Sequence, residues 1–95
     1  MNTKTLKLGE RSWEIPQLPF AVTIEIEPYI MAAAATRRTS TRGMLQIVAA
    51  GLKCVDPNIT FEDLISNFIP IGEAKAAMDI ICIQCGLEVG PEGEA

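Results

Sequence analysis

Two short segments near the start of the chain alternate polar and apolar residues, with Gly9-Glu10 between them. Such alternation is typical of strands with one buried face. The segments cover residues 3–8 and 11–15. A two-residue loop that begins with glycine predicts a type II′ hairpin turn, because glycine adopts a positive φ without strain. The register of this hairpin places four apolar side chains on one face: Leu6, Leu8, Trp13 and Ile15. An isolated hairpin is marginal in water, so this face must pack on helices or on a partner.

A helix is predicted between residues 20 and 37. Pro16 and Pro19 end the second strand, since proline cannot donate to a strand ladder. After Pro28 the pattern is helical, because proline suits the first helical position and four alanines follow. Pro28 could instead kink a longer helix. The alternating apolar residues that begin at Phe20 also leave a strand open for the first part.

Two further helices are predicted from apolar residues that recur every three or four positions. The first follows a polar connection at residues 37–42, extends from Met44 to Val55 and is stopped by Asp56-Pro57-Asn58. The second begins at a capping-box pattern, Thr60-x-x-Asp63, and ends before Pro70.

The predicted last helix, at about residues 72–86, is apolar on nearly all sides. Its first stripe consists of Ala74, Ala77, Met78, Ile81, Cys82 and Cys85. Its second stripe consists of Ala76, Ile80, Ile83 and Leu87. A helix that is apolar all round is buried in a core or in an assembly. A chain of 95 residues has little interior to surround such a helix, so a subunit interface is expected here.

These elements predict an α+β fold that is mostly α, with an N-terminal β-hairpin followed by about four helices. Residues 1–88 are expected to form a single domain, and residues 89–95 a flexible acidic tail. The first ten residues lack the apolar core of a secretory signal, and no apolar run has the roughly 18–20 residues of a membrane helix. Three cysteines, an odd number, fit a reducing compartment. We therefore expect a location inside the cell and no contact with membranes.

The composition argues against catalysis. Histidine is absent, which excludes Ser-His-Asp and Cys-His chemistry and histidine metal ligands. Cys82-x-x-Cys85 suggests a metal or redox site, but a structural zinc site needs four ligands and Cys54 is the only further thiol. Since the pair lies one helical turn apart on the apolar first stripe, we interpret it as core packing. No enzyme activity, metal or cofactor is expected.

The charge pattern argues against nucleic acid as the partner. The net charge of −4 disfavours a general binder of nucleic acids or anionic membranes. Arg37, Arg38 and Arg42 form the one basic cluster, which could hold phosphates or meet an acidic partner. The simpler interpretation is a solvated loop at a helix C-terminus. A small DNA-binding regulator is a weaker alternative, because the following helix offers few side chains that read base edges.

The stretch LGERSWEIPQLPF, followed by IEPYI, resembles the start of the tail assembly chaperones of long-tailed bacteriophages and prophages. The resemblance covers Leu8–Ile30, about a quarter of the chain. It implies a protein of the bacterial cytoplasm that self-associates and binds the tape measure protein, whose long helical chain sets tail length. It also implies that a C-terminal extension made by frameshifting can recruit the tail tube protein.

The expected function is therefore that of a phage tail assembly chaperone that self-associates and binds the tape measure protein through apolar contacts. The alternative is a structural tail or head–tail connector protein of the virion. The residues expected to form the partner or self-association surface come from the hairpin face and its exit, and from the second stripe of the last helix. They are Leu6, Trp13, Ile15, Phe20, Ile80, Ile83 and Leu87.

Overall fold

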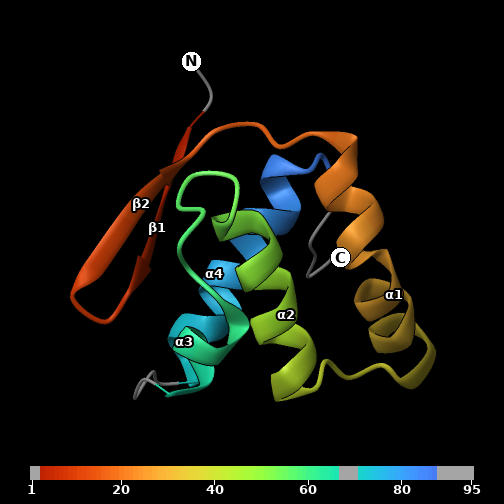
Figure 1. Cartoon of the computed structure of the whole chain (residues 1–95). Helices are drawn as coiled ribbons and strands as arrows, with labels where there is room; N and C mark the ends of the chain where they lie inside the picture. The colour runs from red at the N-terminus through yellow and green to blue at the C-terminus, as the bar shows by residue number, and fades with distance from the viewer. Residues whose placement is uncertain (1–2, 67–70, 88–95) are drawn as a thin grey trace.

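The structure is a computed structural model that describes residues 3–66 and 71–87. An N-terminal hairpin precedes four helices in this part of the chain (Figure 1). The elements are β1 (Lys4–Leu8), β2 (Arg11–Ile15), α1 (Phe20–Thr36), α2 (Thr41–Leu52), α3 (Phe61–Ser66) and α4 (Ile71–Gln84). The hairpin packs on α4, α4 packs on α2, and α1 covers another side of α2. The predicted α+β, mostly α fold is confirmed.

The hairpin has the predicted register, in which Leu6 pairs with Trp13 and Leu8 with Arg11. Gly9 has a φ of 61° and Glu10 has no positive φ, as a type II′ turn requires. The apolar face of the hairpin rests on α4, where Leu6, Leu8 and Ile15 are buried.

Three hydrogen bonds fasten the hairpin and its exit to the two ends of α4. At the start of the helix, the Glu73 carboxylate accepts from the Gly9 N–H at 2.8 Å. Near its end, the Gln84 side-chain amide donates to the Ile15 carbonyl, and the Gln84 carbonyl accepts from the Leu18 N–H, both at 2.8 Å. The hairpin therefore lies along the length of α4, and its apolar face belongs to the core of the protomer.

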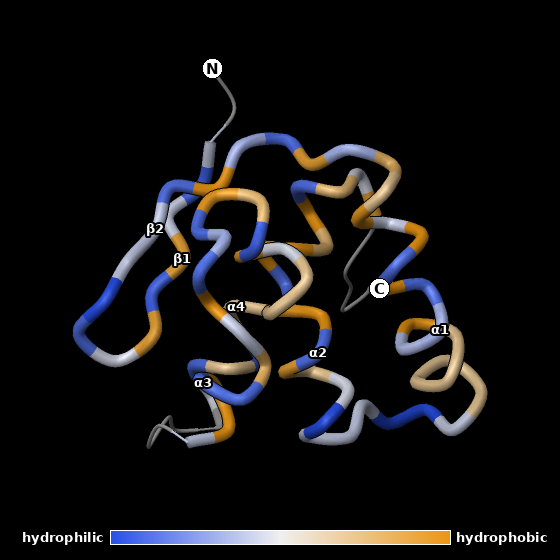
Figure 2. The backbone as a smooth tube through the Cα atoms, in the orientation of Figure 1, coloured by the Kyte–Doolittle hydropathy of each residue, from blue (hydrophilic) through white to orange (hydrophobic). Residues whose placement is uncertain are grey.

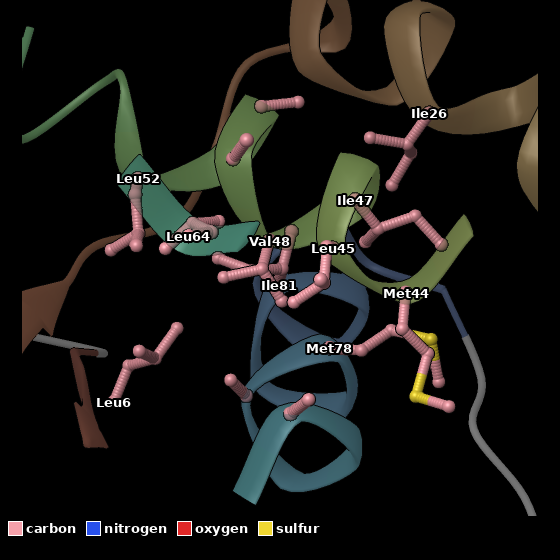
Figure 3. Close-up of a cluster of buried hydrophobic side chains, with 14 of the residues drawn as sticks. Leu6, Ile26, Met44, Leu45, Ile47, Val48, Leu52, Leu64, Met78 and Ile81 are labelled. Carbon is pink, nitrogen blue, oxygen red and sulfur yellow. The ribbon is translucent and has the colours of Figure 1, made fainter. Parts of the chain in front are cut away.

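The first helix is continuous from Phe20 to Thr36, with Pro28 inside it. The strand alternative for its first part is therefore not observed. The helix ends at Arg37, which takes a left-handed conformation with a φ of 60°. Val22 and Ile26 are its buried residues, and Figure 3 shows Ile26 pointing toward Ile47 of α2.

The second helix is buried on nearly every side. Every residue from Gly43 to Leu52 is buried except Gln46, which is half-buried. The helix begins at Thr41, directly after Ser40, whose hydroxyl caps it by accepting from the Gly43 N–H at 2.9 Å. The side chain of Ile81 packs directly over Gly51, where a Cβ would overlap it. The helix enclosed by its neighbours is therefore α2 and not the last helix.

The capping box predicted for α3 is present, and α4 ends in a glycine cap. The Thr60 hydroxyl accepts from the Asp63 N–H at 3.1 Å, and the Asp63 carboxylate accepts from the Thr60 N–H at 3.0 Å. At the end of α4, Gly86 has a φ of 84°, and the Leu87 N–H donates to the Cys82 carbonyl, as in a Schellman cap. The predicted tail at 89–95 lies outside the described residues.

Candidate functional site

The hairpin-face residues expected at a partner surface have two different environments. Leu6 and Ile15 are 0% exposed, so no partner reaches them in this fold. Trp13 is half-buried, and its indole N–H donates to the Asp56 carboxylate at 3.3 Å. The Arg11 guanidinium lies over the Trp13 ring and also contacts Asp56, at 3.2 Å. These three residues therefore tie the hairpin to the segment after α2.

The second stripe of α4 is exposed only in part. Ile83 is 39% exposed, whereas Ile80 and Leu87 are half-buried and pack against the core. The first stripe is buried from Ala74 to Cys82. Part of the apolar circumference of α4 thus lies within the protomer, while Ile83 is a large apolar residue of this helix that stays exposed.

The most exposed large apolar side chains lie on α1. Phe20 is 84% exposed, Ile24 68% and Met31 64%. Their spacing of four and then seven residues places them on one face of the helix, which we call the outer stripe of α1. The opposite face carries Val22 and Ile26 and packs on α2. Figure 2 shows hydrophobic colouring along much of α1.

Sequence reasoning identified Phe20 in this stripe but missed Ile24 and Met31. A usable indication was present, because apolar residues occupy both faces of residues 20–36. The same argument was applied to the last helix, where an all-round apolar pattern led us to expect an interface. In residues 20–36 this indication was obscured, because the alternation of polar and apolar residues from Phe20 to Ile26 also fits a strand.

One carboxylate lies within the outer stripe. Glu27 is exposed and, at 100° per residue, lies on the same face between Ile24 and Met31. The only other charged residue of α1 is Glu25, about a third of a turn away from this face. Pro28 has no N–H, so it cannot donate to the Ile24 carbonyl one turn earlier. The outer stripe therefore combines three large apolar side chains with one carboxylate, and it lacks lysine and arginine.

An apolar crevice of about 200 Å³ lies between part of α1 and the α2–α4 pair. Tyr29 and Ile30 of α1, Ile47 of α2 and Met78 of α4 line it, with Leu87 at the end of the helix. This volume is below the roughly 300–1,000 Å³ of ordinary small-molecule sites. The backbone of α1 lies close to α2 and to no other described element. The crevice therefore marks where α1 is less tightly packed.

Cys82 and Cys85 lack the lowered thiol pKa of a reactive or metal-binding pair. Burial raises the pKa of Cys82 to about 11, and the neighbouring Cys85 and Asp79 act in the same direction. Burial also raises the pKa of Cys85, against the effect of the nearby Thr23 hydroxyl. Both thiols are therefore protonated at neutral pH, whereas nucleophiles and metal ligands are thiolates. Among residues 3–66 and 71–87, no group of three or more cysteine or acidic side chains is placed to hold a metal ion.

The predicted basic cluster is exposed at the end of α1 and the start of α2. Arg37 and Arg38 directly follow α1, where a positive charge is favourable at a helix C-terminus. The Arg42 guanidinium lies over the Phe61 ring, 5.4 Å from its centroid, and so contacts α3. These environments are those of surface arginines with local structural roles.

The described part of the chain thus presents an exposed apolar helix face on α1. Comparison of the chain with protein-family models, with curated proteins and with solved structures gave no match. In residues 3–66 and 71–87, no helix has both the length and the apolar character needed to cross a membrane. The feature most open to a partner is the outer stripe of α1.

Proposed function

We propose that this chain is a tail assembly chaperone of a long-tailed phage or prophage, which self-associates and holds the tape measure protein through apolar contacts. The observation that carries the proposal is the outer stripe of α1, because a helix with one face in the core and large apolar side chains on the other is suited to a protein partner. The resemblance over Leu8–Ile30 adds support, since it includes the first half of this helix.

The size of the outer stripe explains why self-association would matter. Burying three large apolar side chains is worth roughly 5–9 kcal/mol before other costs. Association costs on the order of 4–15 kcal/mol in lost freedom, so one protomer would bind its client weakly. Several joined protomers would bind one long client tightly, because each later contact is intramolecular. Ile83 offers exposed apolar surface outside α1 for contacts between copies.

The chaperone would act by mass action. A client with exposed apolar helices aggregates at a rate that rises with its free concentration. Protomers that cover this surface lower the free concentration and release the client when the tail tube polymerises around it. Recruitment of the tail tube protein through a frameshifted extension belongs to the same proposal.

Co-expression with the tape measure protein of the same phage or prophage tests the proposal. The unchanged chain is expected to keep the tape measure protein soluble and to co-purify with it. Ile24→Ser should reduce both effects several-fold. Ile65→Ser is the matched control, because Ile65 is also an exposed isoleucine but lies on α3. An insoluble tape measure protein, or equal recovery with Ile24→Ser, would refute the proposal, and stable presence in purified tails would favour the structural alternative.

A further inference from the structure

The charge within the outer stripe of α1 indicates what kind of segment it receives. We infer that the outer stripe binds an amphipathic helix of the client that carries a lysine or arginine at the centre of its apolar face. This inference rests on the proposed function and deepens it, because it names the chemistry of the client segment.

The spacing of the outer stripe fits a helix as the occupant. Phe20, Ile24, Glu27 and Met31 follow one another at intervals of four, three and four residues. Intervals of this kind form the seam along which two helices pack side by side. The span from Phe20 to Met31 is about 16 Å at 1.5 Å per residue, or three helical turns. A client helix of at least three turns would cover it.

The position of Glu27 demands a basic partner. A helix laid over Ile24 and Met31 would cover the Glu27 carboxylate between them, and a covered carboxylate without a partner is strongly unfavourable. The Ile24 carbonyl, which receives no bond from Pro28, is a second acceptor on this side of the helix. A lysine or arginine at the centre of the client face would donate to the carboxylate in a charge-assisted hydrogen bond and could reach this carbonyl.

The same charge argues against α1 of a second copy as the occupant. In a parallel in-register pair, Glu27 meets Glu27 of the other copy. In an antiparallel pair that aligns Ile24 with Met31, the two Glu27 residues lie within one residue of each other along the helix axis. Like charges facing each other across a contact are destabilising. Since α1 carries no lysine or arginine, no neighbouring residue of this helix can compensate. Self-association is therefore expected at another surface.

Two synthetic helical peptides provide the probe. Both are three heptads long, with leucine at the a and d positions, and they differ only in lysine or glutamate at the central a position. Their affinities for the full chain are measured by fluorescence anisotropy. The lysine peptide is expected to bind about tenfold more tightly than the glutamate peptide, a difference of about 1.4 kcal/mol. Equal affinities would overturn the inference.

Charge reversal on the chain identifies the residue responsible. Glu27→Lys is expected to invert the preference, so that the glutamate peptide binds more tightly. Glu25→Lys is the matched control, because it makes the same charge change on the same helix away from the outer stripe. It should keep the preference of the unchanged chain. If both variants inverted the preference, the peptides would be responding only to general charge attraction, and the inference would be overturned. A loss of self-association with Ile24→Ser would also overturn it, because the outer stripe would then be a contact between copies.

The two proposals can fail separately. If recovery of the tape measure protein depends on Ile24 but is unchanged by Glu27→Lys, the basic-helix inference is wrong and the chaperone proposal stands. If the tape measure protein is not recovered at all while the peptide preference inverts with Glu27→Lys, the outer stripe binds basic amphipathic helices of another client and the chaperone proposal is wrong.

Discussion

At the scale of single residues, a few close contacts set the packing of this small core. Gly51 lets Ile81 of α4 lie against the backbone of α2, and Figure 3 shows Ile81 close to Val48 at this crossing. Cys82 lies on the same buried stripe as Ile81 and behaves as a small apolar residue whose thiol is kept from water.

Gly51→Ala is expected to lower the free energy of unfolding by about 1–3 kcal/mol, because the added Cβ would overlap the Ile81 side chain. Urea unfolding followed by Trp13 fluorescence measures the change. Gly72→Ala is the matched control, since nothing lies within 4 Å of a Cβ at this helical glycine. Equal stability of the two variants would show that α2 and α4 do not pack as described.

The raised pKa of Cys82 predicts a loss of stability in alkali. Its pKa is about 11 in the folded chain, above the ordinary value of 9.0 for a cysteine thiol. Above pH 9 the unfolded chain releases this proton while the folded chain retains it, so stability is full below pH 9 and falls toward pH 11. Cys82→Ala should lower stability below pH 9 and show a smaller fall above it. An unchanged slope between pH 9 and 11 would exclude Cys82 as the cause.

At the scale of elements, the hairpin and α1 differ in how they are held. The hairpin has its apolar face on α4 and hydrogen bonds to both ends of that helix. In contrast, α1 packs on α2 through one face and borders the crevice. The hairpin is therefore part of the scaffold, whereas α1 presents a surface.

Gln84→Ala is expected to destabilise the chain by about 1–3 kcal/mol, because the buried amide holds the Ile15 carbonyl where water has little access. Glu73→Ala should cost less, since its bond to the Gly9 N–H is exposed. Thermal unfolding of both variants gives the comparison. A larger loss with Glu73→Ala would place the main attachment at the hairpin turn.

Two isoleucines two residues apart test the faces of α1. Ile26→Ala is expected to cost about 2–5 kcal/mol because Ile26 is 0% exposed. Ile24→Ala should change stability by less than about 0.5 kcal/mol because its side chain is on the outer stripe. Urea unfolding measures both. The reverse order would mean that α1 packs with its other face.

At the scale of the whole molecule, the protomer is compact and still carries uncovered apolar surface. Its radius of gyration is 12.4 Å, close to the roughly 12 Å expected for a domain of this length. The outer stripe of α1 is therefore not the result of an undocked helix. It is an exposed face of a packed one.

Self-association should use apolar surface that is exposed outside α1, at Ile83 of α4. The purified protein is expected to sediment as an oligomer at micromolar concentration, and Ile83→Glu should shift it toward the monomer. Since the Ile83 side chain is 39% exposed, the unfolding temperature of the Ile83→Glu variant should change little. A stable 10.3 kDa particle across this range would contradict the prediction.

The sequence was sufficient to predict the structure wherever a short local pattern of residues determines it. The two-residue loop and alternation predicted the hairpin register, and Thr60 and Asp63 predicted the capping box. It was insufficient where burial depends on how many neighbours an element has. The apolar patterns of α1, α2 and α4 do not reveal that α2 is central or that α1 keeps a free face. The long-range bonds of Glu73 and Gln84 have no local pattern at all.

Amide hydrogen exchange with and without the tape measure protein would decide whether the outer stripe of α1 is the client site. Since one face of α1 is exposed whereas α2 is buried on nearly every side, the amides of α1 are expected to exchange faster than those of α2 in the free chain. Client binding should slow exchange between Phe20 and Met31 and leave α2 unchanged. Slower exchange confined to α4, or no change in α1, would contradict the assignment of the outer stripe to the client.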